Sequence, residues 1–205
     1  MNSYISQFND IAKSQINKIG GVEKRPWLEI EPSIIIDISI VQEVITNFYE
    51  SYGLRMEDLV GKCFKNVHLL SLLLLDVGIK NTITIGNVLV NGSARYGCDK
   101  SSIYRDVDVG YECRIADAHA WITLQNGEVI DLSIIPSSEG NAFKRKHMKP
   151  ISCIYFSSKK YSRRYEHIPY FLGDEYIYRV ILEPNERNIS FAQYSAQRIR
   201  ELLAK

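Results

Sequence analysis

The stretch from Cys63 to Val77 constrains the fold of this chain more than any other. Its sequence, CFKNVHLLSLLLLDV, is apolar on nearly every side when it is wound into a helix, and Gly78 follows it. A helix that is apolar all round is stable only when other elements bury it, and glycine commonly follows a helix end. We therefore predict a helix buried in the middle of a domain and ending near Gly78.

After this helix the pattern becomes strand-like. Residues 79–90 are rich in β-branched side chains and stop at Asn91-Gly92, which is typical of a strand followed by a turn. Further strand-like runs follow, and Gln125-Asn126-Gly127 between two of them is a strong hairpin signal. We predict strands at 79–90, 118–124, 128–135, 151–156 and 175–183, with a polar loop at 93–110.

Helical periodicity precedes and follows these strands. Residues 4–19 place apolar side chains along one helix face before Gly20-Gly21, and Val41 to Phe48 do the same before Gly53. A closing helix is predicted at 190–205. Because the helices are grouped before the strands and do not alternate with them, the predicted class is α+β, with helices packed on an antiparallel sheet.

Composition sets the broad class. The 205 residues are 45% hydrophobic, and 25 basic and 24 acidic side chains nearly cancel, so bulk charge indicates neither a membrane nor a nucleic-acid partner. Four cysteines without a C-x-x-C pair suggest neither a zinc site nor a disulfide scaffold, and no metal or cofactor is predicted. No signal-peptide or membrane-spanning run is present, so we expect a soluble cytoplasmic protein, or one exported without a classical signal.

Cys63 is the first candidate for chemistry. It follows Gly61-Lys62 at the predicted start of the buried helix, where free backbone N–H groups and the helix dipole stabilise a thiolate. Gly61 permits close backbone approach, and the amide of Cys63 can point at a developing oxyanion. The alternative is that Cys63 is simply a small buried helix residue.

A thiolate nucleophile needs a base, and the base needs an orienting partner. His119 and Asp131 offer both on one predicted hairpin. A two-residue Asn126-Gly127 turn would put them on opposite faces, whereas a three-residue loop, with Gly127 in the left-handed conformation, places Asp131 opposite Trp121 on the His119 face. We predict the three-residue loop, with His119 and Asp131 roughly 5–8 Å apart along the diagonal.

The other polar candidates have weaker patterns. His68 lies about 140° round the helix from Cys63, so its ring should point elsewhere. His147 and His167 sit in basic, polar segments, where an exposed histidine is expected. Asp117 shares the predicted strand face of His119 and is the substitute for Asp131.

Three motifs, G-K-C-F-K-N at 61–66, A-H-A-W-I-T-L at 118–124 and G-E-V-I-D-L at 127–132, occur in an order that resembles the transglutaminase-like branch of the papain-like superfamily. The resemblance covers about residues 58–135. It implies a papain-like core with Cys63 as nucleophile, His119 as general base and acid, Asp131 as orienter, and Trp121 packed beside the site. The whole chain, 1–205, is then one domain, with a helical part at 1–57, a catalytic core at 58–135 and a basic part at 136–205.

Two departures from the pattern limit what the resemblance implies. Arylamine N-acetyltransferases, a related family, typically carry R-G-G-R-C, but this chain has V-G-K-C at 60–63, which disfavours a coenzyme A acetyltransferase. Papain-like enzymes often place a glutamine before the cysteine to complete the oxyanion hole, but Met56, Glu57 and Asp58 stand here. The second donor is therefore unassigned, and the candidates for it are Asn47, Tyr49 and Tyr52.

Between Lys144 and Tyr165 eight basic residues occur with no acidic one, interleaved with Tyr155, Tyr161 and Tyr165. Such a segment can dock an acidic protein or contact phosphates and bases, but a solvated basic surface is the simpler interpretation, and no nucleic-acid motif accompanies it.

The leading functional hypothesis is a thiol-dependent hydrolase of a protein or peptide-like amide, namely a cysteine peptidase, an amidase or a glutamine deamidase. The alternatives are an acyltransferase or transglutaminase that uses an amine acceptor, and a catalytically inactive binding module that uses the basic 144–165 region.

Overall fold

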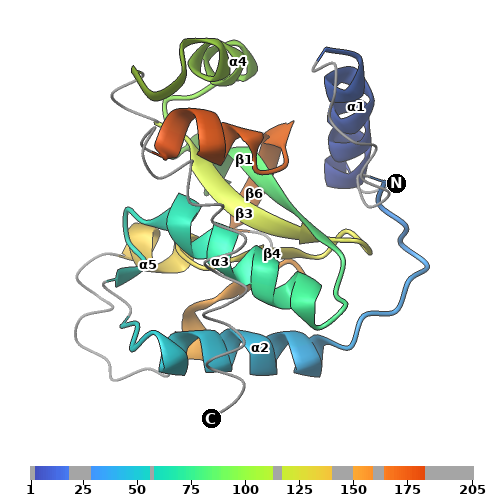
Figure 1. Cartoon of the computed structure of the whole chain (residues 1–205), viewed down its shortest axis with the longest axis vertical. Helices are drawn as coiled ribbons and strands as arrows, with labels where there is room; N and C mark the ends of the chain where they lie inside the picture. Colours follow the sequence, from blue (N-terminus) through green and yellow to red (C-terminus); the bar gives the residue numbers. More distant parts are fainter. Residues whose placement is uncertain are drawn as a thin grey trace.

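The computed structural model of the chain describes residues 3–18, 29–55, 58–112, 117–139, 150–158 and 164–182, and these form an α+β fold (Figure 1). The helices are α1 Ser3–Lys18, α2 Ile38–Ser51, α3 Cys63–Asp76, α4 Lys100–Val109 and α5 Ile134–Glu139. The strands are β1 Asn81–Val90, β2 Ser93–Ala94, β3 His119–Leu124, β4 Val129–Asp131, β5 Tyr155–Phe156 and β6 Tyr165–Leu172. The predicted helix at 190–205 lies outside the described residues.

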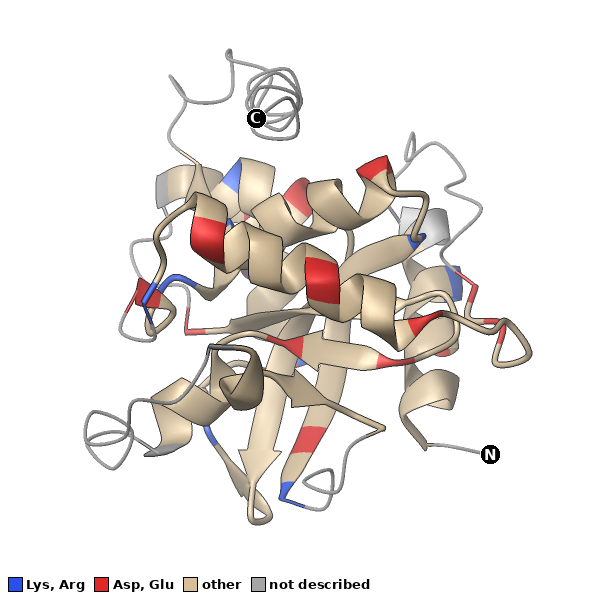
Figure 2. Cartoon of the chain, turned by 90° about the horizontal axis from the view of Figure 1, so that it is seen from below, with Lys and Arg blue, Asp and Glu red and all other residues tan. Residues whose placement is uncertain are grey.

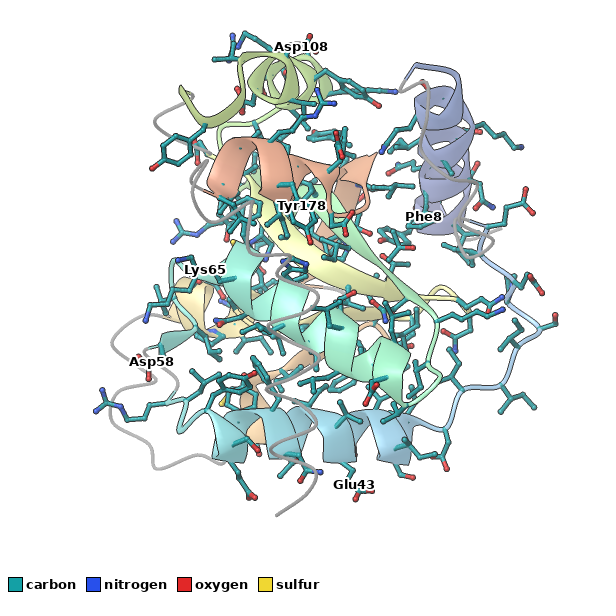
Figure 3. All side chains as sticks on the ribbon, viewed as in Figure 1. Phe8, Glu43, Asp58, Lys65, Asp108 and Tyr178 are labelled. Atoms are coloured by element: carbon teal, nitrogen blue, oxygen red, sulfur yellow. The ribbon has the colours of Figure 1, made fainter. Side chains whose placement is uncertain are left out.

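The strands form one antiparallel sheet in the order β2-β1-β3-β4-β5, and β6 also pairs with β1. Side chains alternate between its two faces, as the pleat of a strand requires. On β3, Ala120 and Ile122 join the core under α2 and α3, whereas Trp121 joins the core under α1. The helices therefore cover both faces, with Phe8 pointing from α1 toward the sheet (Figure 3).

The ends of α2 and α3 match the predicted ones and have local causes. Asp37 caps the start of α2 by accepting a hydrogen bond from the backbone N–H of Ser39 at 2.9 Å. Gly53 and Gly78 follow the two helices with φ of +57° and +80°, a backbone conformation that glycine adopts most easily. The predicted burial of α3 is confirmed for most of the helix, because Val67, Leu70 and Leu74 are fully buried, but Leu75 near its end is exposed.

Several sequence predictions were wrong in the second half of the chain. The predicted loop at 93–110 contains α4, which begins with a capping box between Asp99 and Ser102. The predicted strand at 175–183 contains a π-helix at Ile177–Ile181, because Tyr176, Ile177 and Val180 are buried at a helical spacing. In the predicted strand at 151–156, residues 150–153 form a 3₁₀ helix. The predicted strand at 128–135 ends at Asp131, and α5 begins at Ile134.

The described residues show neither a membrane-spanning helix nor an exposed basic, tyrosine-bearing surface. No helix among the described residues is long and apolar enough to cross a bilayer. Acidic side chains outnumber basic ones on this part of the chain (Figure 2), because most basic residues of the 144–165 segment lie outside it. The tyrosines at 155 and 165 are buried and pack edge to face, so they do not form an exposed surface on which bases could stack.

Candidate active site

The hairpin that carries His119 and Asp131 has the predicted register. Ile122 pairs with Ile130 and Thr123 with Val129, the pairing that a three-residue loop from Gln125 to Gly127 requires. The N–H of Gly127 donates to the carbonyl of Leu124 at 2.9 Å, and Gly127 has φ of +87°. This register puts His119, Trp121 and Asp131 on one face of the sheet.

His119 and Asp131 form a direct hydrogen bond. The Nε2 atom of His119 lies 2.7 Å from Oδ2 of Asp131, and both side chains are at most 1% exposed. The other carboxylate oxygen, Oδ1, accepts the backbone N–H groups of Ser133 and Ile134, each at 2.9 Å. The carboxylate is thus held at both oxygens, and since it can only accept, Nε2 of His119 must carry a proton.

Burial and charge act against each other in this pair. Burial alone would lower the pKa of His119, but the Asp131 carboxylate and the Cys63 side chain outweigh it and raise that pKa to about 10. Burial would raise the pKa of Asp131, but His119 and His167 hold it well below its usual range. The pair is therefore an imidazolium and a carboxylate at neutral pH.

Cys63 is the first residue of α3 and is buried. Lys62 makes no side-chain cap, so the first backbone N–H groups of α3 have no capping side chain. Gly61 turns the chain into the helix with φ of +73°; because nothing lies within 4 Å of where its Cβ would be, conformation and not close approach explains the glycine.

The thiol of Cys63 interacts with the ring of His119 and contributes to its raised pKa. Asp131 occupies Nε2, so Nδ1 is the ring nitrogen left for the thiol. Nδ1 is buried and has no hydrogen-bond partner among the described residues. The thiol and the ring are therefore close without a fully formed hydrogen bond, as is common in catalytic sites before substrate binds.

Tyr96, from the segment predicted as a loop, packs on His119. The two rings are stacked, with centroids 4.8 Å apart and planes at 8°. Asn87 holds Tyr96 in place, because its side chain donates to the carbonyl of Tyr96 at 2.7 Å and accepts its N–H at 3.1 Å. Nothing in the sequence pattern indicated this role, since Tyr96 lies in the irregular segment between β2 and α4.

Trp121 packs beside the site, as the resemblance implied. Its indole N–H donates to the hydroxyl of Tyr4 at 2.9 Å, and that hydroxyl is 2.5 Å from Thr123. The Trp121 ring also requires Gly86, because a Cβ at Gly86 would lie 2.9 Å from Cη2 of Trp121 and 2.0 Å from the carbonyl oxygen of Ile168. Tyr4 and Gly86 therefore hold the Trp121 ring in its position beside His119.

His167 was wrongly predicted to be exposed. It lies on β6 at a buried position, and its Nε2 atom is 2.9 Å from the same Oδ2 of Asp131 that His119 contacts. Trp121 and Tyr155 pack on its ring at 4.9 and 4.8 Å between centroids. The alternation of buried Tyr165, His167 and Phe171 along β6 is the signal that could have identified it, but the basic run before it obscured the strand.

The remaining candidates lie elsewhere. The carboxylate of Asp117 is exposed and accepts the N–H of Gly97 at 2.8 Å, so Asp131 and not Asp117 is the partner of His119. His68 is buried against Tyr178, as its predicted separation from Cys63 allows. Asn47 and Tyr52 line a hollow of about 500 Å³ beside Leu73 and Val77, at the opposite end of α3 from Cys63.

The described residues also include a buried tyrosine, Tyr49, and two further buried cysteines, but no cluster of metal ligands. The hydroxyl of Tyr49 is buried without a hydrogen-bond partner among the described residues, and burial raises its pKa. Cys98 and Cys153 are buried cysteines like Cys63; burial raises the pKa of Cys98 to about 11 and also raises the pKa of Cys153. Within the described ranges, no group of three or more His, Cys, Asp or Glu side chains is arranged to hold a metal ion.

A comparison with protein families, with curated proteins and with solved structures finds no match for this chain. The resemblance to transglutaminase-like enzymes therefore rests on Cys63, His119, Trp121 and Asp131 and on their order along the chain.

Proposed function

We propose that this protein is a thiol-dependent hydrolase of amide bonds in proteins or peptide-like compounds, with Cys63 as nucleophile, His119 as base and acid, and Asp131 as the orienting carboxylate. The observation that carries the proposal is the buried hydrogen bond of 2.7 Å between His119 and Asp131, with Nδ1 of His119 left unpartnered and the Cys63 side chain beside the ring. A buried imidazole with only one nitrogen satisfied is costly in a purely structural role.

The proposed reaction begins at the thiol. In the resting ion pair Nδ1 of His119 already holds the proton that Cys63 has given up, and the thiolate sulfur attacks the amide carbon to give a tetrahedral oxyanion. The N–H groups at the start of α3, which have no capping side chain, would stabilise that oxyanion. His119 then gives its proton to the departing nitrogen, the carbon–nitrogen bond breaks, and an amine leaves behind a thioester on Cys63.

Water completes the cycle. His119, neutral again, removes a proton from water as its oxygen attacks the thioester carbon, and the carbon–sulfur bond breaks to release an acid and the thiolate. We favour hydrolysis over transfer to an amine because water is always present and no acceptor site is recognisable among the described residues. The order of α3, β3 and β4 supports the further proposal that this core is papain-like.

The proposal can be tested with a peptide library that contains glutamine and a variety of backbone amides. Mass spectrometry would identify new carboxylates from cleavage or deamidation, and a parallel reaction with glycine ethyl ester would detect transfer to an amine. We expect hydrolysis by the wild-type chain and none by Cys63→Ala. Cys153→Ala, which removes another buried thiol, is the matched control and should retain turnover.

Turnover that persists in Cys63→Ala would refute the proposal. Incorporation of the amine in preference to water would favour the acyltransferase alternative. The binding-module alternative would be supported if no amide is processed and Cys63 reacts with iodoacetamide as an ordinary thiol, with or without His119.

A further inference from the structure

The Asp131 carboxylate receives two imidazoles on one oxygen atom. Nε2 of His119 lies at 2.7 Å and Nε2 of His167 at 2.9 Å from Oδ2, and the side chains of all three residues are at most 3% exposed. Because an ionised carboxylate can only accept, both rings must donate an N–H to it. A Cys-His-Asp triad needs only the first of these two contacts.

Orientation of Asp131 does not explain the second imidazole. Oδ1 already accepts the backbone N–H groups of Ser133 and Ile134, which fix the plane of the carboxylate. What His167 adds is a second donor to the oxygen on which His119 depends. A donor that shares this oxygen withdraws part of its negative charge from His119.

The surroundings favour the neutral form of His167. Burial lowers its pKa, and the positive charge of His119 lowers it further, although Asp131 acts in the opposite sense. His167 is one of the residues that line a polar hollow of about 430 Å³, together with residues of α1, β4, β5 and β6. The titratable and charged groups that act on this cluster from the elements around it are His119 of β3, Asp131 of β4, Tyr155 of β5, Tyr165 and Glu166 of β6, Tyr4 of α1, Tyr49 of α2, Cys63 of α3, and Tyr96.

We propose that His167 is a positioning residue for the reaction: by donating a neutral hydrogen bond to Oδ2 of Asp131, it divides the negative charge of that oxygen between two imidazoles. This inference rests on the proposed function for its meaning. In that reaction a base that holds its proton too tightly cannot return it to the leaving group, and proton transfer is most efficient when the base titrates near the working pH. His167 thus moderates the basicity that Asp131 confers on His119.

The sign of the effect separates this role from a packing role. If His167 shares the charge of Asp131, then His167→Phe raises the pKa of His119, because the full carboxylate charge faces that ring alone. If His167 only packs the cluster, the same change loosens Asp131 and lowers the pKa of His119. His167→Gln keeps an N–H donor at nearly the same reach and should restore the wild-type value.

The experiment is an NMR titration of the His119 ring in full-length chains that carry Cys63→Ala, which removes the thiol from the titration and makes the result independent of catalysis. Adding His167→Phe should raise the proton affinity of His119 roughly tenfold, and adding His167→Gln should leave it within about threefold. An unchanged or lowered affinity with His167→Phe would overturn the inference.

A second measurement needs no change at His167 and so does not depend on how the Phe variant folds. In the Cys63→Ala chain, the nitrogen shifts of the His167 ring should show a neutral ring with its proton on Nε2 throughout neutral pH. A proton on Nδ1 alone, or a charged ring, would overturn the inference. Failure of the proposed function would appear separately, as turnover or labelling that does not depend on Cys63.

Discussion

Replacing Asp131 with asparagine should convert Cys63 into an ordinary thiol. Oδ1 of Asp131 faces two backbone N–H groups, which cannot change their protonation, so the asparagine oxygen must stay there. The new NH₂ group then replaces Oδ2 and points at Nε2 of His119. To avoid two opposed donors, His119 must lose its Nε2 proton and keep the proton on Nδ1, the nitrogen left for the thiol, so it can no longer act as a base.

The size of the effect follows from the pKa of His119. At about 10, this pKa keeps His119 an imidazolium up to about pH 8. The proposed mechanism needs this charge to hold Cys63 as a thiolate, and it therefore predicts an alkylation rate that hardly changes from pH 6 to 8. An ordinary thiol with a pKa of about 8.5 is roughly 0.3% thiolate at pH 6 and roughly 24% at pH 8. The ratio of rates at pH 8 and pH 6 should therefore be near 1 for the wild type and about 75 for Asp131→Asn.

The assay is the rate of iodoacetamide labelling at Cys63, read by peptide mass spectrometry at several pH values. The ratio is used because a weakly basic thiolate is also a weaker nucleophile, which would distort a comparison at one pH. Asp117→Asn is the matched control, since this exposed carboxylate caps Gly97 and should leave the wild-type profile. A steep profile in the wild type, or a flat one in Asp131→Asn, would refute the reasoning.

Three further outcomes are expected. Tyr4→Phe removes the hydroxyl that the indole N–H of Trp121 and the hydroxyl of Thr123 share, and it should lower the free energy of unfolding in urea by about 1–3 kcal/mol. Tyr49→Phe removes a buried hydroxyl that has no partner among the described residues, and it should leave the free energy of unfolding unchanged. Equal losses in the two variants would contradict this. Gly86→Ala forces a Cβ into the Ile168 carbonyl and should lower the free energy of unfolding by roughly 3 kcal/mol or more. Gly78→Ala introduces only backbone strain and should lower it by about 1 kcal/mol. Similar losses in the two variants would show that the sheet shifts to accommodate a side chain at Gly86. Because its pKa is raised, His119 contributes stability that is complete below pH 6.5 and is lost as the pH rises through about 10. Because the pKa of Asp131 is lowered, the same interaction is lost in acid, at pH values below 3.8, the ordinary pKa of an aspartate. Urea midpoints of the wild type should therefore fall between pH 6.5 and 10 relative to those of His119→Phe, and a constant difference would argue against a charged pair.

The parts of the fold that local patterns determine could be predicted from sequence. The apolar side chains all round α3 and the glycine after it predicted both the burial of this helix and its end. Gln125-Asn126-Gly127 predicted a hairpin, and the three-residue loop was chosen because the two-residue turn would have put His119 and Asp131 on opposite faces. The segment at 175–183 misled the prediction, because aromatic and β-branched residues favour a strand intrinsically, whereas packing of Tyr176 and Ile177 in the core selected a helical conformation.

The site was predictable only where its residues lie on neighbouring elements. His119 and Asp131 share a hairpin, so their contact follows from register. Tyr96 and His167 reach the site from segments that are distant along the chain, and their contacts depend on how β6 pairs with β1 and how Asn87 anchors Tyr96. No local pattern specifies such long-range pairing.

The most direct measurement of the central claim is acylation of the chain by p-nitrophenyl acetate, an activated ester that needs no knowledge of the natural substrate. We predict a burst of p-nitrophenolate equal to the amount of protein, with one acetyl group on Cys63, absent in Cys63→Ala and slow in His119→Ala. A missing burst, or an acetyl group on Cys98 or Cys153 in place of Cys63, would contradict the assignment of Cys63 as the nucleophile.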